Sequence, residues 1–305
     1  MTVGVMMRRL LTSLLVPAVL AALAGCGAPA SADGRIPMVA AFYPLQFVSE
    51  RVGGDLVRVT NLTKPGAEPH DVELSPRQVA RISDASLAVY LHGFQPAVDD
   101  AIKQNATGKG FDAADAVTLE HAEESDEHDH EHGADPHVWL DPTLLAAISD
   151  RLAARLAQVD PAHAGDYTAR AATLHAQLIA LDGEFAAGLA TCERRELVTS
   201  HTAFHYLAER YHLTQIGITG VDPEAEPSPR RLAEVAADAR AHGTTTIFFE
   251  TLVSPKVAET IAREVGASTA VLDPLEGLTD PDADYFSVMR ANLSALTTAL
   301  GCEPS

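Results

Sequence analysis

Short apolar runs alternate along the chain with longer segments in which apolar residues recur every three or four positions. The short runs are rich in β-branched residues, so they predict strands, and the longer segments predict helices between them. This alternation is typical of βαβ units, which build parallel sheets. The predicted strands are 38–42, 57–62, 87–91, 196–199, 214–218, 245–249 and 269–272.

Five Ser-Pro or Asp-Pro pairs indicate where helices begin. In each pair the Ser or Asp side chain can accept a hydrogen bond as the N-cap, and Pro takes the first helical position, where no amide hydrogen is needed. The pairs are Ser75-Pro76, Asp141-Pro142, Asp160-Pro161, Ser228-Pro229 and Ser254-Pro255.

The longest helical pattern covers residues 161–190. Its apolar residues form one stripe, made of Tyr167, Ala171, Leu174, Leu178, Leu181, Phe185 and Leu189. At about 1.5 Å per residue such a helix is roughly 43 Å long, which is enough to run along two lobes. Three predicted strands precede it and four follow. We therefore predict an α/β fold of two lobes, residues 36–160 and 191–305, each with a central, mostly parallel sheet flanked by helices.

The first 25 residues have the order of parts of a signal peptide. Arg8 and Arg9 precede an apolar run over 10–24, which is too short and too broken at Pro17 to be interpreted first as a membrane span. Residues 23–26 (LAGC) resemble the bacterial lipobox, which predicts lipid on Cys26; the alternative is an ordinary secretory signal with a chance cysteine. Residues 26–35 then form a flexible tether. We expect an extracytoplasmic protein whose only membrane anchor is this lipid.

Two cysteines remain in the mature chain, Cys192 and Cys302. In an exported protein an even number predicts a disulfide, which here would fasten the last predicted helix, 285–300, to the middle of the chain. The alternative is a cysteine-based metal site, but the chain has no closely spaced cysteines of that kind.

The charge of the chain is strongly negative. It has 22 Lys and Arg against 42 Asp and Glu, a net charge of −20, and removal of residues 1–25 takes away two arginines and leaves −22. Phosphate backbones and anionic membrane surfaces would be repelled, so we expect no nucleic-acid partner. A cationic ligand fits this charge.

One segment of low complexity, 121–137, contains five His and seven Asp or Glu and no Lys or Arg. Its lack of periodicity predicts a solvated loop. Alternating imidazoles and carboxylates favour weak binding of divalent cations, although an ordinary acidic surface loop is the alternative. The candidate auxiliary ligands are His121, His128, His130 and His132.

Metal-capable side chains follow several of the predicted strands. Because ligands bind at the carboxyl ends of strands in open α/β sheets, we expect these residues to converge. They are His70 after 57–62, His92 after 87–91, His201 after 196–199, Glu250 after 245–249, Asp273 after 269–272, and His137 at the exit of the acidic loop.

Four motifs contain most of these residues: 66–76 (GAEPHDVELSP), 135–142 (DPHVWLDP), 200–204 (SHTAF) and 272–275 (LDPL). Together they resemble the motifs of the metal-specific solute-binding proteins of ABC transporters, the zinc and manganese uptake lipoproteins. The resemblance covers essentially the whole mature chain, in order. It implies two α/β lobes joined by one long rigid helix.

The resemblance also implies the ligands. His70 and His137 would bind the metal from the first lobe, and His201 and Asp273 from the second. In some zinc-binding members the fourth place is open to water or another carboxylate. Glu250 matches a family motif near the site, and we expect it to orient His201 through the other ring nitrogen.

The ligand set favours Zn²⁺, with manganese or iron as the alternatives. Three imidazoles and one carboxylate suit a small four-coordinate ion, whereas Mn²⁺ favours more oxygen ligands. In the family, His at the third position marks zinc-type members, and this chain has His201 there.

The resemblance implies a monomeric carrier that is not an enzyme. It would capture Zn²⁺ between its lobes and deliver it to an ABC permease that a cytoplasmic ATPase drives. Two alternatives are a secreted zinc metallohydrolase and an adhesin. The sequence has no His-Glu-x-x-His motif or Gly-x-Ser-x-Gly elbow, and nothing in it specifies a macromolecular receptor.

Overall fold

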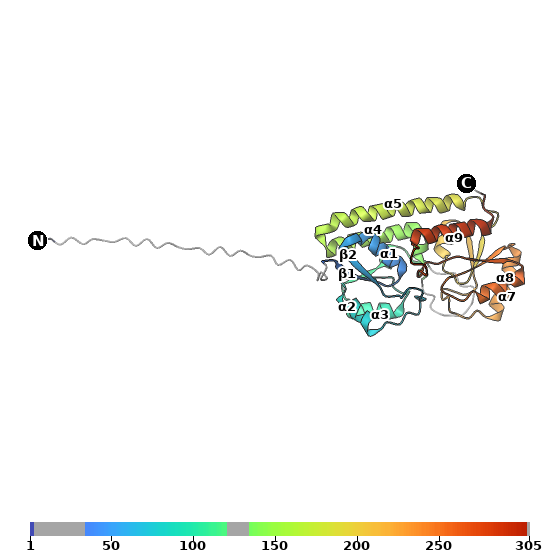
Figure 1. Cartoon of the computed structure of the whole chain (residues 1–305), viewed down its shortest axis with the longest axis horizontal. Coiled ribbons are helices and arrows are strands. Elements are labelled where there is room, and N and C mark those ends of the chain that lie inside the picture. Colours follow the sequence, from blue (N-terminus) through green and yellow to red (C-terminus); the bar gives the residue numbers. More distant parts are fainter. Residues whose placement is uncertain (3–33, 121–133, 304–305) are drawn as a thin grey trace.

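The computed structural model describes residues 1–2, 34–120 and 134–303. Residues 34–120 and 134–303 form two α/β lobes spanned by long helices (Figure 1). The predicted signal peptide, Cys26 and most of the tether lie outside the described residues. So do His121, His128, His130 and His132. Among the described helices, none is long and apolar enough to cross a membrane.

The first lobe contains a parallel sheet with strand order β2-β1-β3-β4. Its strands are β1 (Ile36–Ala40), β2 (Val57–Asn61), β3 (Leu87–Tyr90) and β4 (Gly110–Asp112). Helices of this lobe are α1 (Tyr43–Gly53), α2 (Pro76–Asp84) and α3 (Pro96–Asn105), with short 3-10 turns η1 (Gly54–Leu56), η2 (Ala113–Ala116) and η3 (Val138–Leu140). The first three strands were predicted; β4 was not.

The second lobe repeats the arrangement. Its parallel sheet has the order β6-β5-β7-β8, so the first strand of each lobe lies between the second and the third. The strands are β5 (Glu196–Thr199), β6 (Thr214–Gly217), β7 (Thr246–Phe249) and β8 (Ser268–Val271). The helices are α6 (His205–Arg210), α7 (Pro229–Ala241), α8 (Lys256–Val265) and α9 (Tyr285–Leu300). The predicted fold class is confirmed.

Two long helices connect the lobes. They are α4 (Pro142–Val159) and α5 (Ala164–Gly188), joined by the 3-10 turn η4 (Pro161–His163). In Figure 1, α5 runs along both lobes, over α1 and α4 in the first and beside α9 in the second. The predicted stripe of this helix is buried from Tyr167 to Phe185. A helix with one buried stripe along its length holds both lobes at a fixed spacing.

Two exposed ion pairs attach the second half of α5 to the second lobe. Arg210 of α6 binds both carboxylate oxygens of Asp182, at 2.9 and 2.8 Å. Arg290 of α9 binds Glu184 in the same bidentate way, at 2.7 and 2.8 Å. The arginines lower the pKa of both carboxyl groups below their ordinary values, against a smaller opposing effect of burial.

Alternation along the strands divides the second lobe into two apolar layers. Leu197 and Phe248 belong to the large core, which continues through α5 and α9 into the first lobe. Their neighbours Val198 and Ile247 face the other side, where they pack with α7 and α8 in a separate, smaller core. Successive residues of a strand point to opposite faces, so one strand serves both layers.

The predicted helix starts are correct at three of the five pairs. Ser75, Asp141 and Ser228 each accept a hydrogen bond from a backbone amide of the helix that follows. Asp160 instead precedes the 3-10 turn η4 and makes no side-chain cap. Helix α8 begins at Lys256 with Pro255 in the N-cap position, so Ser254 is not the cap.

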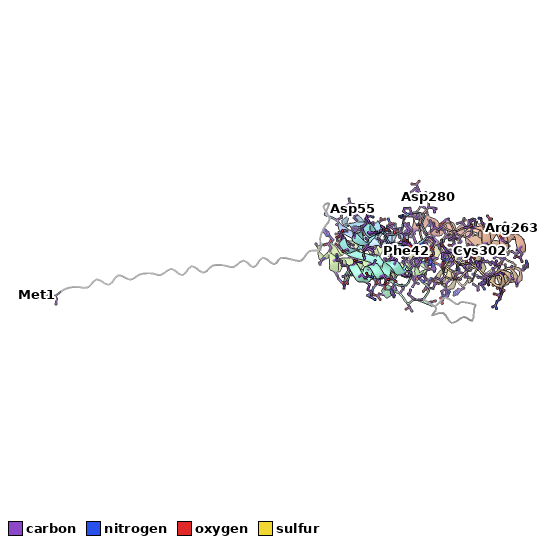
Figure 2. The ribbon with its side chains drawn as sticks, turned by 90° about the horizontal axis from the view of Figure 1, so that it is seen from below. Met1, Phe42, Asp55, Arg263, Asp280 and Cys302 are labelled. Atoms are coloured by element: carbon purple, nitrogen blue, oxygen red, sulfur yellow. A yellow bond between two sulfur atoms is a disulfide. The ribbon has the colours of Figure 1, made fainter. Side chains whose placement is uncertain are left out.

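The predicted disulfide between Cys192 and Cys302 is present, and it connects the end of α9 to the segment after α5. Figure 2 places Cys302 in the second lobe. It also shows Asp55 and Arg263 near opposite ends of the two-lobed body, with Phe42 between them. Phe42 is fully buried and contacts Trp139 edge-on, with ring centroids 4.8 Å apart.

Candidate metal centre

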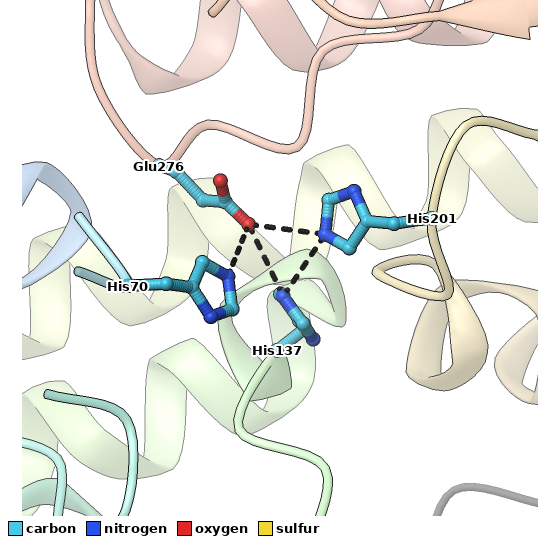
Figure 3. A group of neighbouring side chains, drawn as sticks. All are labelled: His70, His137, His201 and Glu276. Carbon is cyan, nitrogen blue, oxygen red and sulfur yellow. Dashed lines mark hydrogen bonds and ion pairs between the residues drawn. The ribbon is translucent and has the colours of Figure 1, made fainter. Parts of the chain in front are cut away.

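Three imidazoles and one carboxylate meet between the lobes (Figure 3). Oε1 of Glu276 lies 3.3 Å from Nε2 of His70, 3.1 Å from Nε2 of His137 and 3.3 Å from Nε2 of His201. The Nε2 atoms of His137 and His201 are 3.4 Å apart. A tetrahedral ion with bonds of about 2.0–2.1 Å places its ligand atoms about 3.3 Å apart. The group therefore has the dimensions of a four-coordinate site.

The topology explains why these residues meet. His70 lies in the loop after β2, His201 directly after β5 and Glu276 in the loop after β8, while His137 immediately precedes η3. The strand-end positions lie at the carboxyl ends of two parallel sheets with the same strand order. This is the edge at which open α/β sheets bind their ligands.

Buried carboxylates fix the orientation of two of the histidines. Nδ1 of His137 lies 2.7 Å from Oδ1 of Asp135, and Nδ1 of His201 lies 2.6 Å from Oε1 of Glu250. With Nδ1 as the hydrogen-bond donor, Nε2 of each ring is directed to the centre of the group. The structure thus places Glu250 in the contact that we expected. Asp135 was not among the expected site residues; its position two residues before His137 in the motif 135–142 was the available indication.

The electrostatics of the group are those of a cation site. Burial opposes charge on His201, but Glu250 and Glu276 outweigh it and raise its pKa to about 10. The pKa of His137 is raised in the same way by Asp135 and Glu276, against its burial. Burial would raise the pKa of Glu276, yet the three imidazoles hold it well below its ordinary value. Protons and metal ions therefore compete for the same ring nitrogens.

His70 is held differently. Its side chain is 12% exposed, whereas those of His137 and His201 are 0% exposed. Its backbone amide donates to both carboxylate oxygens of Glu68, and its ring contacts Phe94 edge-on at a centroid distance of 4.5 Å. Burial raises the pKa of Glu68 to about 7, against the opposing effect of that amide.

Direct hydrogen bonds join the segment around His137 to the second lobe. Tyr206 of α6 donates to the carbonyl of Asp135 at 2.9 Å. Trp139 donates from Nε1 to the carbonyl of Pro274, and Tyr285 of α9 donates to the carbonyl of Trp139, both at 2.7 Å. These contacts set the distance between His137 and the ligands of the second lobe.

The structure does not bring Asp273 into this group. Glu276 occupies the position that we expected for Asp273. Oδ1 of Asp273 accepts from the amide of Leu275 at 2.8 Å, and Oδ2 accepts from Thr251 at 3.0 Å. An Asp that binds the backbone two residues on is a turn former. With Leu275 at a positive φ of 60°, this turn directs Glu276 into the site. The Asp-Pro pair was a turn indication that we interpreted as a ligand position.

His92 also lies apart from the group. Its side chain is 71% exposed and Nδ1 lies 3.2 Å from Asp99. Of the histidines that follow predicted strands, the structure therefore brings together only His70 and His201, and it adds His137 to them.

Comparison with known proteins identifies relatives that cover most of the chain. Residues 38–299 match the family described as ZnuA, zinc-uptake complex component A periplasmic. The chain is 37% identical over 288 residues to the zinc-binding protein AdcA of Streptococcus pyogenes serotype M6, with 87% of this chain and 56% of AdcA covered. It is 34% identical over 289 residues to the high-affinity zinc uptake system protein ZnuA of Bacillus subtilis, with 90% of both covered.

A solved structure agrees with these matches. The laminin-binding protein Lmb of Streptococcus agalactiae, described as a bifunctional protein with adhesin and metal-transporting activity, superposes with a TM-score of 0.79. It is 34% identical, with 86% of this chain and 98% of Lmb covered. The chain spans 56–58% of the length of the AdcA relatives, so part of each has no counterpart here.

Proposed function

Since the chain belongs to the ZnuA family, we propose that it is an extracytoplasmic carrier that captures Zn²⁺ between its two lobes for import. The observation that carries the proposal is the convergence of three Nε2 atoms and one carboxylate oxygen, with neighbouring separations of 3.1–3.4 Å. The proposed ligands are His70, His137, His201 and Glu276. Glu276 takes the place that we expected for Asp273.

The choice of metal follows from the ligand atoms. Three nitrogens and one oxygen at tetrahedral spacing fit Zn²⁺, whereas Mn²⁺ and Fe²⁺ are better served by more oxygens and a larger coordination number. Cu²⁺ and Ni²⁺ bind imidazoles at least as well in vitro, so the physiological ion needs a test in the cell.

Delivery follows from how the lobes are joined. Ligands come from both lobes, while α5 and the bonds of Trp139 and Tyr285 already fix their relative position. We infer that binding and release use small shifts of the ligand loops rather than a wide hinge motion. The ion would pass to an ABC permease with its ATPase, from a monomer held at the membrane by lipid on Cys26. In this role the protein is not an enzyme.

The test is metal analysis of the purified protein with matched variants. After dialysis we expect the wild type to retain one tightly bound equivalent of Zn²⁺ and His201→Ala to lose it. His175→Ala is the control, because His175 is an exposed histidine paired with one carboxylate, Asp150, at 2.8 Å. Retention of zinc by His201→Ala with unchanged affinity would overturn the site.

Growth and activity assays separate the alternatives. A deletion strain should fail to grow under zinc limitation and should recover with zinc but not with manganese; recovery with manganese alone would assign the other metal. Turnover of a hydrolase substrate that disappears with the metal would indicate an enzyme. Binding of laminin without any zinc phenotype would indicate an adhesin like that described for Lmb.

A further inference from the structure

A second group of metal-capable side chains lies at the junction of the lobes, outside the centre described above. It consists of Glu120, which follows η2, and His205 and Glu209 of α6. Nε2 of His205 lies 3.1 Å from Oε2 of Glu120 and 3.8 Å from Oε2 of Glu209. One ligand atom from each residue lies within 4.8 Å of the other two.

The backbone around Glu120 is fixed from two sides. Its amide donates to the hydroxyl of Tyr206 at 2.8 Å, and its carbonyl accepts from the amide of Asp135 at 2.7 Å. Tyr206 is itself buried and is the neighbour of His205 on α6. The two lobes therefore present these three side chains to each other through a defined contact. His205 and Glu209 are four residues apart, so they lie on the same side of the helix.

The charges of this group are unbalanced without a cation. Two carboxylates face one imidazole, and the next basic residue along α6, Arg210, is bound to Asp182. The proximity of Glu120 raises the pKa of Glu209. A divalent ion on the three side chains would replace the repulsion between carboxylates with direct bonds.

We propose that Glu120, His205 and Glu209 form a second site for a borderline divalent cation such as Zn²⁺, with water completing the coordination. One nitrogen and two oxygens give it fewer nitrogen ligands than the centre at Glu276. The exposed fractions of its side chains are 44% for Glu120, 29% for His205 and 60% for Glu209, so solvent reaches it directly. It therefore binds more weakly than the first site and exchanges its ion more readily.

The experiment is a calorimetric Zn²⁺ titration in two stages. His121, His128, His130 and His132 are first replaced by Ser, so that the acidic loop contributes no imidazole. One equivalent of Zn²⁺ loads the first site, and a second equivalent is then titrated. We expect His205→Ala to weaken binding of the second equivalent at least about tenfold and to leave the affinity for the first unchanged. Glu209→Gln should weaken it by a smaller factor.

Matched controls are His175→Ala, an exposed histidine with one carboxylate partner, and Glu259→Gln, an exposed acid on α8. Neither should alter the second equivalent. If His205→Ala fails to bind the first equivalent, its fold is disturbed and Glu209→Gln decides. Absence of a second equivalent, or one that neither substitution weakens, overturns this site. Loss of the first equivalent in His201→Ala tests the main centre independently.

Discussion

Two histidines of the metal centre have carboxylate partners at both ring nitrogens, whereas the third has one at Nε2. His137 and His201 are fully buried, and each presents Nδ1 to a buried carboxylate, Asp135 or Glu250. His70 is partly exposed, and its ring makes a T-shaped contact with Phe94. The site therefore has a rigid half made by His137, His201 and Glu276, and a more accessible corner at His70.

This difference separates two tasks of a carrier. Outer carboxylates raise the basicity of a ring and fix its direction, which increases affinity. A partly exposed ligand can leave the ion first, since water can replace it without a cavity being opened. We infer that His70 is the first ligand to move when the ion enters or leaves.

The largest expected effect is that of removing a ligand from the rigid half. His201→Ala should weaken Zn²⁺ binding by more than about 100-fold, beyond what loss of an outer partner costs, because it also leaves Glu250 buried without its imidazole. Competition with a zinc chelator of known affinity measures this. A decrease in Zn²⁺ affinity smaller than that caused by His70→Ala would contradict the division into a rigid half and an accessible ligand.

The second prediction concerns pH. The raised pKa of His201, about 10, means that its proton stabilises the zinc-free protein below the ordinary value of 6.5 and that this stability is lost as the pH rises through the raised value. Zinc requires the neutral ring, so each proton displaced changes affinity by up to about tenfold per pH unit. The increase in Tm on adding Zn²⁺ should therefore grow between about pH 5 and about pH 8. An increase that does not vary over this range would count against the three-histidine site.

His70→Ala should have a smaller effect, about 10- to 100-fold, because solvent reaches this corner and a water can take the fourth position. The release rate of Zn²⁺, measured by stopped-flow chelation, should rise more than the capture rate falls. His92→Ala, a change in an exposed histidine of the same lobe, is the control. An unchanged release rate would show that His70 is not the mobile ligand.

The smallest effect expected at the site is that of Glu250→Gln, about tenfold. The amide oxygen of Gln can still accept the hydrogen bond from His201. The substitution removes the negative charge that raises the pKa of His201. Binding should therefore weaken and its pH dependence should shift to lower pH. Calorimetry at two pH values measures both, and a shift to higher pH would refute the role of the charge.

The sequence predicted the larger features of the fold for physical reasons. Buried parallel strands are short apolar runs, so seven of the eight described strands were found. The eighth, β4, is the three-residue run Gly110-Phe111-Asp112 at a sheet edge, which has no apolar pattern to detect. His70 and His201 were expected to converge because both follow strands of parallel sheets, and His137 was found through the motif at 135–142.

The carboxylate of the site was missed because sequence order does not show which of two acids a turn directs inward. Asp273 and Glu276 both follow β8, and the choice between them is made by the bonds of Asp273 to Leu275 and Thr251. The group at His205 was missed for a different reason. Glu120 lies 85 residues before His205 along the chain and belongs to the other lobe.

The bond between Cys192 and Cys302 turns nearly the whole second lobe into a covalent ring, whose two ends have a sequence separation of 110. The polypeptide enters and leaves this ring at one place, beside the end of α5. A single proteolytic cut anywhere between residues 193 and 301 would therefore release no fragment: His201 and Glu276 would remain tethered to the first lobe. If a protease cuts the backbone inside this ring, the two lobes therefore stay covalently connected.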